Sequence, residues 1–193
     1  EGDQLYYSDD AGQKIQVKRI YNRVIFDELE RRPDLNLRFD FAKAYDVEWA
    51  GHPNWFYRIS KFSLPLFNSP YVPETYYLDQ LIQYPQDLKN FVLKPLYSFA
   101  GAGVELHITR ERLDDIQNKE NYLLQRKVNY EPVIQTPDIH AKMELRVMLL
   151  WLPDEERPRI VNNLVRLSKG EMIGVKYNKD KTWVGGTVGF FEA

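Results

Sequence analysis

Apolar and polar residues alternate in short runs over the first part of the chain, a pattern that predicts strands. Two such runs flank the polar turn at residues 9–12, whose sequence is Asp-Asp-Ala-Gly. The apolar positions of the second run are Ile15, Val17, Ile20 and Val24. Because a glycine-containing polar turn between alternating runs is typical of a hairpin, we predict that the fold begins with one, within residues 4–27.

Apolar residues at helical spacing predict short helices in three places. Residues 27–32 form a helical turn that Pro33 ends, and Thr109 precedes a helix with Glu111 in its first turn, where a carboxylate suits the helix dipole. Asn54 is placed to cap a third helix. The inward positions of that helix would be Trp55, Ile59, Phe62 and Leu66.

Further apolar runs predict the remaining strands. They cover residues 45–49, 72–78, 88–96, 104–108 and 122–128, with 104–108 as the hairpin partner of 88–96. Residues 144–152 are almost wholly apolar after Arg146, which predicts a strand in the middle of a sheet. Residues 159–167 alternate and are predicted to return antiparallel to it.

One lysine stands inside an apolar strand. Lys94 has apolar neighbours on both sides, and burying its ammonium is costly unless an anion meets it. Gly101 and Gly103 follow, and glycine lets backbone N–H groups approach an anion closely. The segment indicates a clamp for nucleotide phosphate, and a hairpin with an exposed lysine is the alternative for this segment taken alone.

Composition narrows the classes of function. The 193 residues are enough for one domain or two small lobes, and the net charge of −2 disfavours nucleic acid and acidic membranes as partners. There is no cysteine and no run of about 18 apolar residues, so thiol chemistry is excluded and no membrane span is expected. We expect a cytoplasmic protein. The chain begins with Glu1, and we expect it to be part of a longer protein.

Several further motifs stand in a characteristic order around the lysine strand. They are IYNRVIFDEL, DVEWAGHPNW, ISKFSLPLFNSPYVPETYYL with Lys61, LLQRKV at residues 123–128, ELRVM from Glu144, and NNLVRLSKGEMIGVKYN with Arg166. Each is weak alone. Their order, over nearly the whole chain, resembles the ATP-grasp superfamily, in particular its circularly permuted members such as glutathionylspermidine synthetase-like proteins.

The resemblance implies an α+β, two-lobed fold whose antiparallel sheets enclose a nucleotide cleft. Residues 62–128 would form the smaller, nucleotide-clamping lobe, and residues 1–61 and 129–193 the larger lobe for metal and substrate. A domain that precedes this core in the family would be missing. The implied function is an ATP- and Mg²⁺-dependent ligase that activates a small-molecule or peptide carboxylate as an acyl phosphate, which an amine or thiol attacks.

The resemblance also implies which residues hold ATP. Lys61 and Lys94 would contact phosphate, with the loop from Gly101 to Gly103 as a flap, although a solvated helix lysine is an equal interpretation of Lys61. A carboxylate accepts two ribose hydroxyls, and Glu131 and Glu144 are both candidates for it. The adenine hinge would include Gln125, Lys127 and Val128.

Metal ligands and charge-stabilising arginines complete the implied site. Asp27 and Asn54 would hold Mg²⁺, an oxygen-preferring ion. His52 stands where the family has Glu, so Glu48 is the alternative carboxylate, and His52 itself could equally be a turn residue packed on Trp55.

Arg146 and Arg166, on adjacent strands, would stabilise the transferring γ-phosphoryl group. Arg23 would contact substrate or phosphate. Structural salt bridges are the common alternative for the arginine pair, and pairing with Asp27 is the simpler account of Arg23.

Two other functions stay open at this stage. The His52 substitution is compatible with a degenerate ATP-grasp domain that binds nucleotide or peptide without turnover. The 4 Trp, 13 Tyr and 10 Phe residues are compatible with an interaction module, although aromatic residues in strands are more often core positions. The acyl donor, the acceptor and the oligomeric state do not follow from the sequence.

Overall fold

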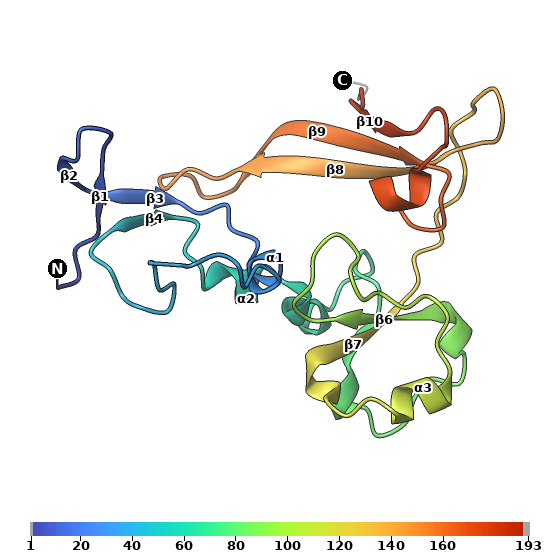
Figure 1. Cartoon of the computed structure of the whole chain (residues 1–193). Helices are drawn as coiled ribbons and strands as arrows, with labels where there is room; N and C mark the ends of the chain where they lie inside the picture. Colours follow the sequence, from blue (N-terminus) through green and yellow to red (C-terminus); the bar gives the residue numbers. More distant parts are fainter. Residues whose placement is uncertain (1, 191–193) are drawn as a thin grey trace. The chain divides into compact units, whose positions relative to one another are not determined.

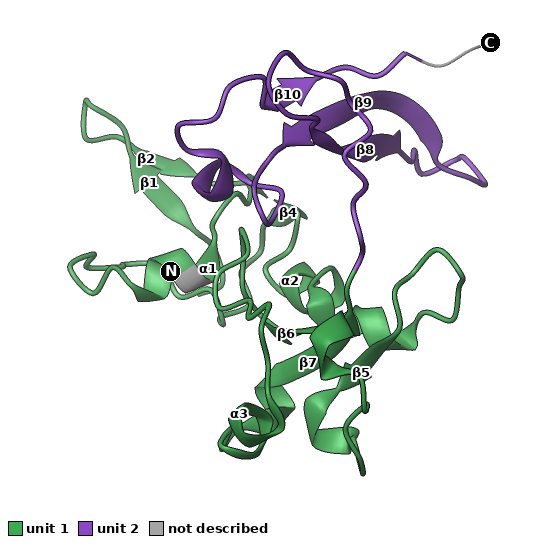
Figure 2. Cartoon of the chain, turned by 90° about the vertical axis from the view of Figure 1, so that its right-hand side faces the viewer, with its two compact units in different colours: residues 1–127 green, residues 128–193 purple. Residues whose placement is uncertain are grey.

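Short strands and short helices build the chain, as its short apolar runs predict (Figure 1). The computed structural model describes residues 2–190, apart from the side chain of Asp27. Small sheets, most of them antiparallel, alternate with helices of three to six residues, which confirms the α+β class. Two compact units divide the chain, residues 1–127 and 128–193 (Figure 2). Within the described residues no helix has the length and apolarity needed to cross a membrane.

The first strands form the predicted hairpin. β1 (Tyr6–Ser8) pairs antiparallel with β2 (Lys14–Gln16), and the Asp9 carboxylate accepts hydrogen bonds from the amides of Ala11 (3.0 Å) and Gln13 (2.8 Å). The second run is broken, however, because β3 (Arg19–Tyr21) leaves this hairpin and pairs in parallel with β4 (Glu48–Ala50).

The helices of unit 1 are shorter than predicted. α1 (Phe26–Glu30) ends before Pro33 as expected, but the predicted helix after Asn54 is split into α2 (Trp55–Arg58) and the 3₁₀ helix η1 (Lys61–Leu66). The split follows from Ser60, whose hydroxyl accepts from the Phe62 amide (3.2 Å) and so starts a new turn. All four residues predicted to point inward are consequently exposed, so that prediction is wrong: Trp55, Ile59, Phe62 and Leu66.

A three-stranded antiparallel sheet lies at the centre of unit 1, with β5 (Thr75–Tyr77), β7 (Tyr122–Arg126) and β6 (Phe91–Pro95) in the order β5-β7-β6. The prediction that residues 104–108 form a strand paired with β6 is wrong. That segment makes only one bridge, Glu105 to Leu93, before Thr109 caps α3 (Arg110–Asp114) by accepting from the Arg112 amide (3.2 Å). The strand from Tyr122 therefore takes the central position.

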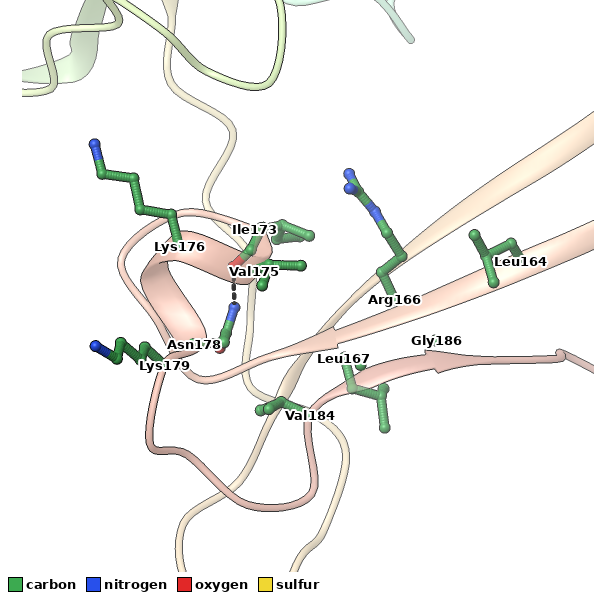
Figure 3. A pocket seen from close by; sticks show the side chains of 12 residues that line it. Leu164, Arg166, Leu167, Ile173, Val175, Lys176, Asn178, Lys179, Val184 and Gly186 are labelled. Atoms are coloured by element: carbon green, nitrogen blue, oxygen red, sulfur yellow. Dashed lines mark hydrogen bonds between the residues drawn. The ribbon is translucent and has the colours of Figure 1, made fainter.

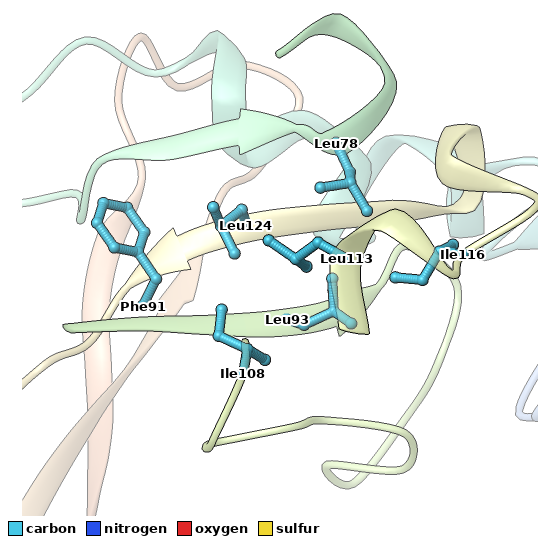
Figure 4. Packing of buried hydrophobic residues seen from close by; sticks show 7 residues of the cluster. All are labelled: Leu78, Phe91, Leu93, Ile108, Leu113, Ile116 and Leu124. Atoms are coloured by element: carbon cyan, nitrogen blue, oxygen red, sulfur yellow. The ribbon is translucent and has the colours of Figure 1, made fainter. Parts of the chain in front are cut away.

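The two faces of this sheet differ in kind. On one face Phe91, Leu93 and Leu124 pack against α3 and neighbouring turns in a buried core, which is completed by Leu78, Ile108, Leu113 and Ile116 (Figure 4). The 3₁₀ helices η2 (Leu78–Gln80), η3 (Leu88–Asn90) and η4 (Lys119–Asn121) connect its elements. Because strand residues alternate between faces, Lys94 and Gln125 belong to the opposite face.

Unit 2 is a second antiparallel sheet, with strand order β10-β9-β8. β8 (Lys142–Leu150) and β9 (Arg159–Ser168) form the predicted long hairpin, and β10 (Gly185–Thr187) follows the 3₁₀ helix η5 (Val175–Asn178). The prediction that residues 144–152 lie in the middle of a sheet is wrong. β9 is central, because the chain after η5 returns alongside it and leaves β8 at the edge.

A buried lysine makes the stability of unit 2 sensitive to acid. The side chain of Lys169 is 1% exposed, and its ammonium donates to the Asp138 carboxylate and to the carbonyl oxygen of Thr182 (2.9 Å). This ammonium holds the pKa of the Asp138 carboxyl well below its ordinary value of 3.8. Because the pKa is depressed on folding, the ion pair stabilises the fold above about pH 4, and this stabilisation is lost as the pH falls below that value.

We therefore expect Asp138→Asn to lower the urea midpoint of unfolding at pH 7 and to weaken its dependence on pH below about pH 4. Far-UV circular dichroism across pH 2–7, with about half-unit steps, measures both effects. Asp154→Asn, at an exposed carboxylate of the same unit, is the matched control and should leave the profile unchanged. Superimposable profiles for the two variants would contradict the assignment.

Candidate functional site

Lys94 lies on the face of the β5-β7-β6 sheet that is opposite to the Phe91–Leu93–Leu124 core, and it is the first member of a hydrogen-bond chain. Its ammonium donates to Gln125 Oε1 (2.5 Å), the Gln125 amide nitrogen donates to Thr75 Oγ1 (2.9 Å), and Thr75 donates to the carbonyl oxygen of Pro73 (2.7 Å). Burial lowers the pKa of Lys94. Within the part of the chain that the structure describes, this ammonium has a neutral amide oxygen and no carboxylate beside it.

Lys61, the second lysine proposed from the sequence, contacts the glycine-containing loop. Its ammonium donates to the carbonyl oxygen of Ser98 (2.5 Å) and to Ser98 Oγ (3.0 Å), and that hydroxyl donates to the carbonyl oxygen of Ala102 (2.9 Å). The ring of Phe99 stacks on Phe56, with 5.0 Å between centroids. The structure thus brings Lys61 and the loop together, and Ser98 is a contact that the sequence analysis missed.

The loop from Ser98 to Val104 requires glycine. Gly101 and Gly103 have φ values of 77° and 68°, in the left-handed region, and Ala100 has a φ of 50°. A Cβ on Gly103 would lie 2.7 Å from Pro95 Cγ at the end of β6. Among the described residues, the amides of Ala100, Gly101 and Gly103 have no hydrogen-bond acceptor. The loop therefore presents unpaired N–H groups next to Lys61 and close to the end of the Lys94 strand.

Several hydrogen-bonding groups of the proposed adenine hinge are already bonded within the protein. The Gln125 side chain is already bonded to Lys94 and Thr75, and the Lys127 amide donates to the carbonyl oxygen of Asn90 (2.8 Å). The Lys127 ammonium donates to the carbonyl oxygen of Lys89 (2.6 Å). Val128 and Glu131 are exposed. The boundary between the two units falls within this hinge segment, directly after Lys127.

The described candidates for Mg²⁺ do not converge on one point. Glu48 binds Arg19, with its Oε2 2.6 Å and 2.9 Å from two guanidinium nitrogens. His52 Nδ1 accepts from the Asn54 amide (3.1 Å), and its ring lies edge-on to Trp49 (5.4 Å between centroids), so His52 acts as a turn residue. The side chain of Asp27 lies outside the described residues. Among the described residues no group of three or more His, Cys, Asp or Glu side chains could hold a metal ion.

In unit 2 the two predicted arginines share one carboxylate. Glu144 lies opposite Arg166 in the β8–β9 register, and Arg166 donates to Glu144 Oε1 from Nε (2.9 Å) and Nη2 (2.5 Å). Arg146 Nη2 is 3.9 Å from the same oxygen. Arg23 belongs to unit 1, where its Nη1 donates to the Tyr21 hydroxyl (3.4 Å). Glu144 is therefore an ion-pair partner, which leaves it less able to bind ribose.

Arg166 also lines a cavity of about 600 Å³ within unit 2 (Figure 3). Ile173 and Val175 come to it from η5 and the turn before it, and Leu164 from β9, while the ammonium groups of Lys176 and Lys179 point away from Arg166. Gly186 keeps this wall open, since a Cβ there would lie 3.2 Å from Leu164 Cδ1. These apolar residues lie within the motif NNLVRLSKGEMIGVKYN, but the sequence analysis singled out only Arg166 from it.

Comparison with known proteins adds nothing to this geometry. Neither models of protein families, nor curated proteins, nor solved structures show a match to the chain. Its function is therefore inferred from the contacts described above and from the motif order.

Proposed function

We propose that this chain binds ATP through unit 1, with the phosphates against Lys61, Lys94 and the loop from Ser98 to Val104. The observation that supports this most is the half-buried Lys94 ammonium, which has only a neutral amide oxygen beside it. A desolvated cation without an anionic partner is unfavourable, and a bound phosphate removes that cost. An ammonium has three donors, so two are left for phosphate after the bond to Gln125.

The loop supplies the complementary half of this phosphate site. Its unpaired amides provide dipoles that point to an anion without any side-chain charge. The Glu105 carboxylate, whose backbone pairs with Leu93 in the Lys94 strand, is already neutralised by Arg112, whose guanidinium nitrogens lie 2.6 Å and 2.9 Å from its oxygens. Among the described residues the Lys94 ammonium has no carboxylate beside it, which favours an anion there.

The proposed reaction is that of an ATP-grasp ligase, as the motif order implies. A carboxylate attacks the γ-phosphorus of ATP, the bond to the β-γ bridging oxygen breaks and ADP leaves, and an amine or thiol then displaces phosphate from the acyl phosphate. The chain would contribute positioning and charge, with Lys61 and Lys94 on phosphate. We further propose a two-lobed fold, with residues 62–128 as the smaller lobe and residues 1–61 and 129–193 as the larger one, and we propose that the protein acts in the cytoplasm.

A second candidate function is nucleotide binding without turnover. Its support is that the carboxylates expected to serve metal and ribose are engaged elsewhere, Glu48 with Arg19 and Glu144 with Arg166. Arg19 and Glu48 both lie on strands of the same small sheet, so their pairing also has a structural role.

Calorimetric titration of the chain with ATP, with and without Mg²⁺, tests the shared part of both proposals. We expect ATP to bind more tightly than AMP, because the loop and the two lysines contact the terminal phosphates. No binding of ATP in either condition would overturn both. Release of ADP over panels of carboxylic acids and amines then separates them: release supports the ligase, and its absence with retained binding supports the second candidate.

A further inference from the structure

Unit 1 contains a cavity whose wall is mainly aromatic. The cavity has a volume of about 400 Å³ and lies against α1 and α2, which are neighbours in Figure 1. Five of its lining residues carry aromatic rings: Phe26, Phe41, Phe56, Tyr57 and Tyr97. They come from four separate segments of the chain, so the site exists only in the folded unit.

The rings of the wall contact one another in edge-on and tilted pairs. Phe26 meets Phe41 edge-on, with 5.2 Å between centroids, and Tyr57 meets Tyr97 edge-on at 5.4 Å. Phe56 joins the two pairs, at 6.3 Å from Phe26 and 5.9 Å from Tyr97. Tyr57 is 57% exposed and the other four rings are half-buried, so they form a lined hollow and not a closed core.

The negative charge in the lining of this cavity favours a cationic ligand. Among the described lining side chains Glu30 is the only charged one, and its carboxylate has no ion-pair or hydrogen-bond partner within the described residues. Aromatic faces carry negative potential and attract cations. A carboxylate and several rings around one hollow therefore favour an organic cation and disfavour an anion such as phosphate.

We propose that this aromatic cavity binds a small organic cation with a quaternary ammonium head. Such a head needs no hydrogen-bond acceptors and loses little hydration on transfer, which suits a wall made mostly of rings. Neither lysine nor any residue of the loop from Ser98 to Val104 lines the cavity, although Phe99 of that loop stacks on Phe56 of the cavity wall.

Titration with three probes tests the proposal. Choline should bind about tenfold or more tightly than its neutral isostere, in which a tert-butyl group replaces the trimethylammonium group, because only the cation gains from the rings. Ethanolamine should also bind more weakly than choline. The N-methyl proton resonance of bound choline should move upfield, since ring currents shield groups held over aromatic faces. Equal binding of choline and its isostere, or of choline and ethanolamine, would overturn the proposal.

Two variants measure the contributions of the rings and of the carboxylate to choline affinity separately. Phe41→Leu keeps an apolar side chain but removes a ring, and we expect it to reduce the choline affinity roughly fivefold and the upfield shift with it. Glu30→Gln, at the end of α1, should reduce affinity roughly threefold without changing the fold. Glu28→Gln, on the same helix but outside the cavity, is the control. Unchanged choline affinity in both Phe41→Leu and Glu30→Gln would contradict the site.

Discussion

Replacing Leu93 by alanine is expected to lower the free energy of unfolding by about 3 kcal/mol, the range found for fully buried leucines. The side chain is 0% exposed and packs within the buried core of unit 1, so its loss leaves a cavity as well as removing apolar burial. The backbone of Leu93 also exchanges two hydrogen bonds with Glu105 (2.9 Å and 3.0 Å), which the variant keeps. The loss is therefore one of packing.

Urea denaturation followed by far-UV circular dichroism measures this effect, and hydrogen exchange of the β6 and β7 amides assigns it to unit 1. Leu66→Ala is the matched control in the same unit. Leu66 is 70% exposed, so its replacement should change the free energy of unfolding by less than about 0.5 kcal/mol. Equal losses for the two variants would show that the core described here does not hold the unit together.

Lys94→Met is expected to weaken ATP binding by about 30-fold or more, the loss of a charge-assisted contact worth about 2 kcal/mol. Stability should change far less. The variant removes the cost of burying an ammonium but leaves Gln125 Oε1 without its donor, and these effects oppose each other. We expect a net change in the free energy of unfolding below about 1 kcal/mol.

Calorimetric titration with ATP and urea denaturation of the same samples give both numbers. Lys18→Met, at an exposed lysine in unit 1, controls for the general loss of a positive charge and should bind ATP normally. If Lys94→Met binds ATP as tightly as the unaltered chain does, Lys94 is not a phosphate contact. Should affinity and stability instead fall together, the lysine would be a structural residue.

Local signals in the sequence were sufficient for several elements. The turn from Asp9 to Gly12 predicts the first hairpin, because the Asp9 carboxylate bonds to backbone amides only two and four residues later and glycine is favoured in turns. Thr109 predicts the start of α3 for the same reason, since an N-cap needs only the next three amides.

Predictions of strand partners were less successful. The apolar run from Glu144 resembles a central strand, yet β8 is an edge strand, since the position of a strand depends on where the chain returns after residue 168. Likewise the segment at 104–108 lies along the edge of β6 opposite to β7 but pairs with it only at Glu105, and Thr109 then begins α3.

The candidate site shows the same division. The sequence placed Lys94 on a half-buried strand and glycines after it, and the structure has both. The ion-pair partners of the charged groups could not be predicted from the sequence. Glu48 pairs with Arg19 and Glu144 with Arg166 across strand pairs that no local pattern specifies. The aromatic cavity likewise draws its rings from four segments.

The sequence by itself determined the α+β class, the turns and caps, the long β8–β9 hairpin and the buried position of Lys94, since each depends on residues close together in the chain. Only the tertiary structure decided which strand is central in each sheet, which acids are neutralised by arginine, and that Lys61 meets the glycine-containing loop through Ser98. These contacts join residues that are tens of positions apart, and their energies depend on distance and burial in the folded units.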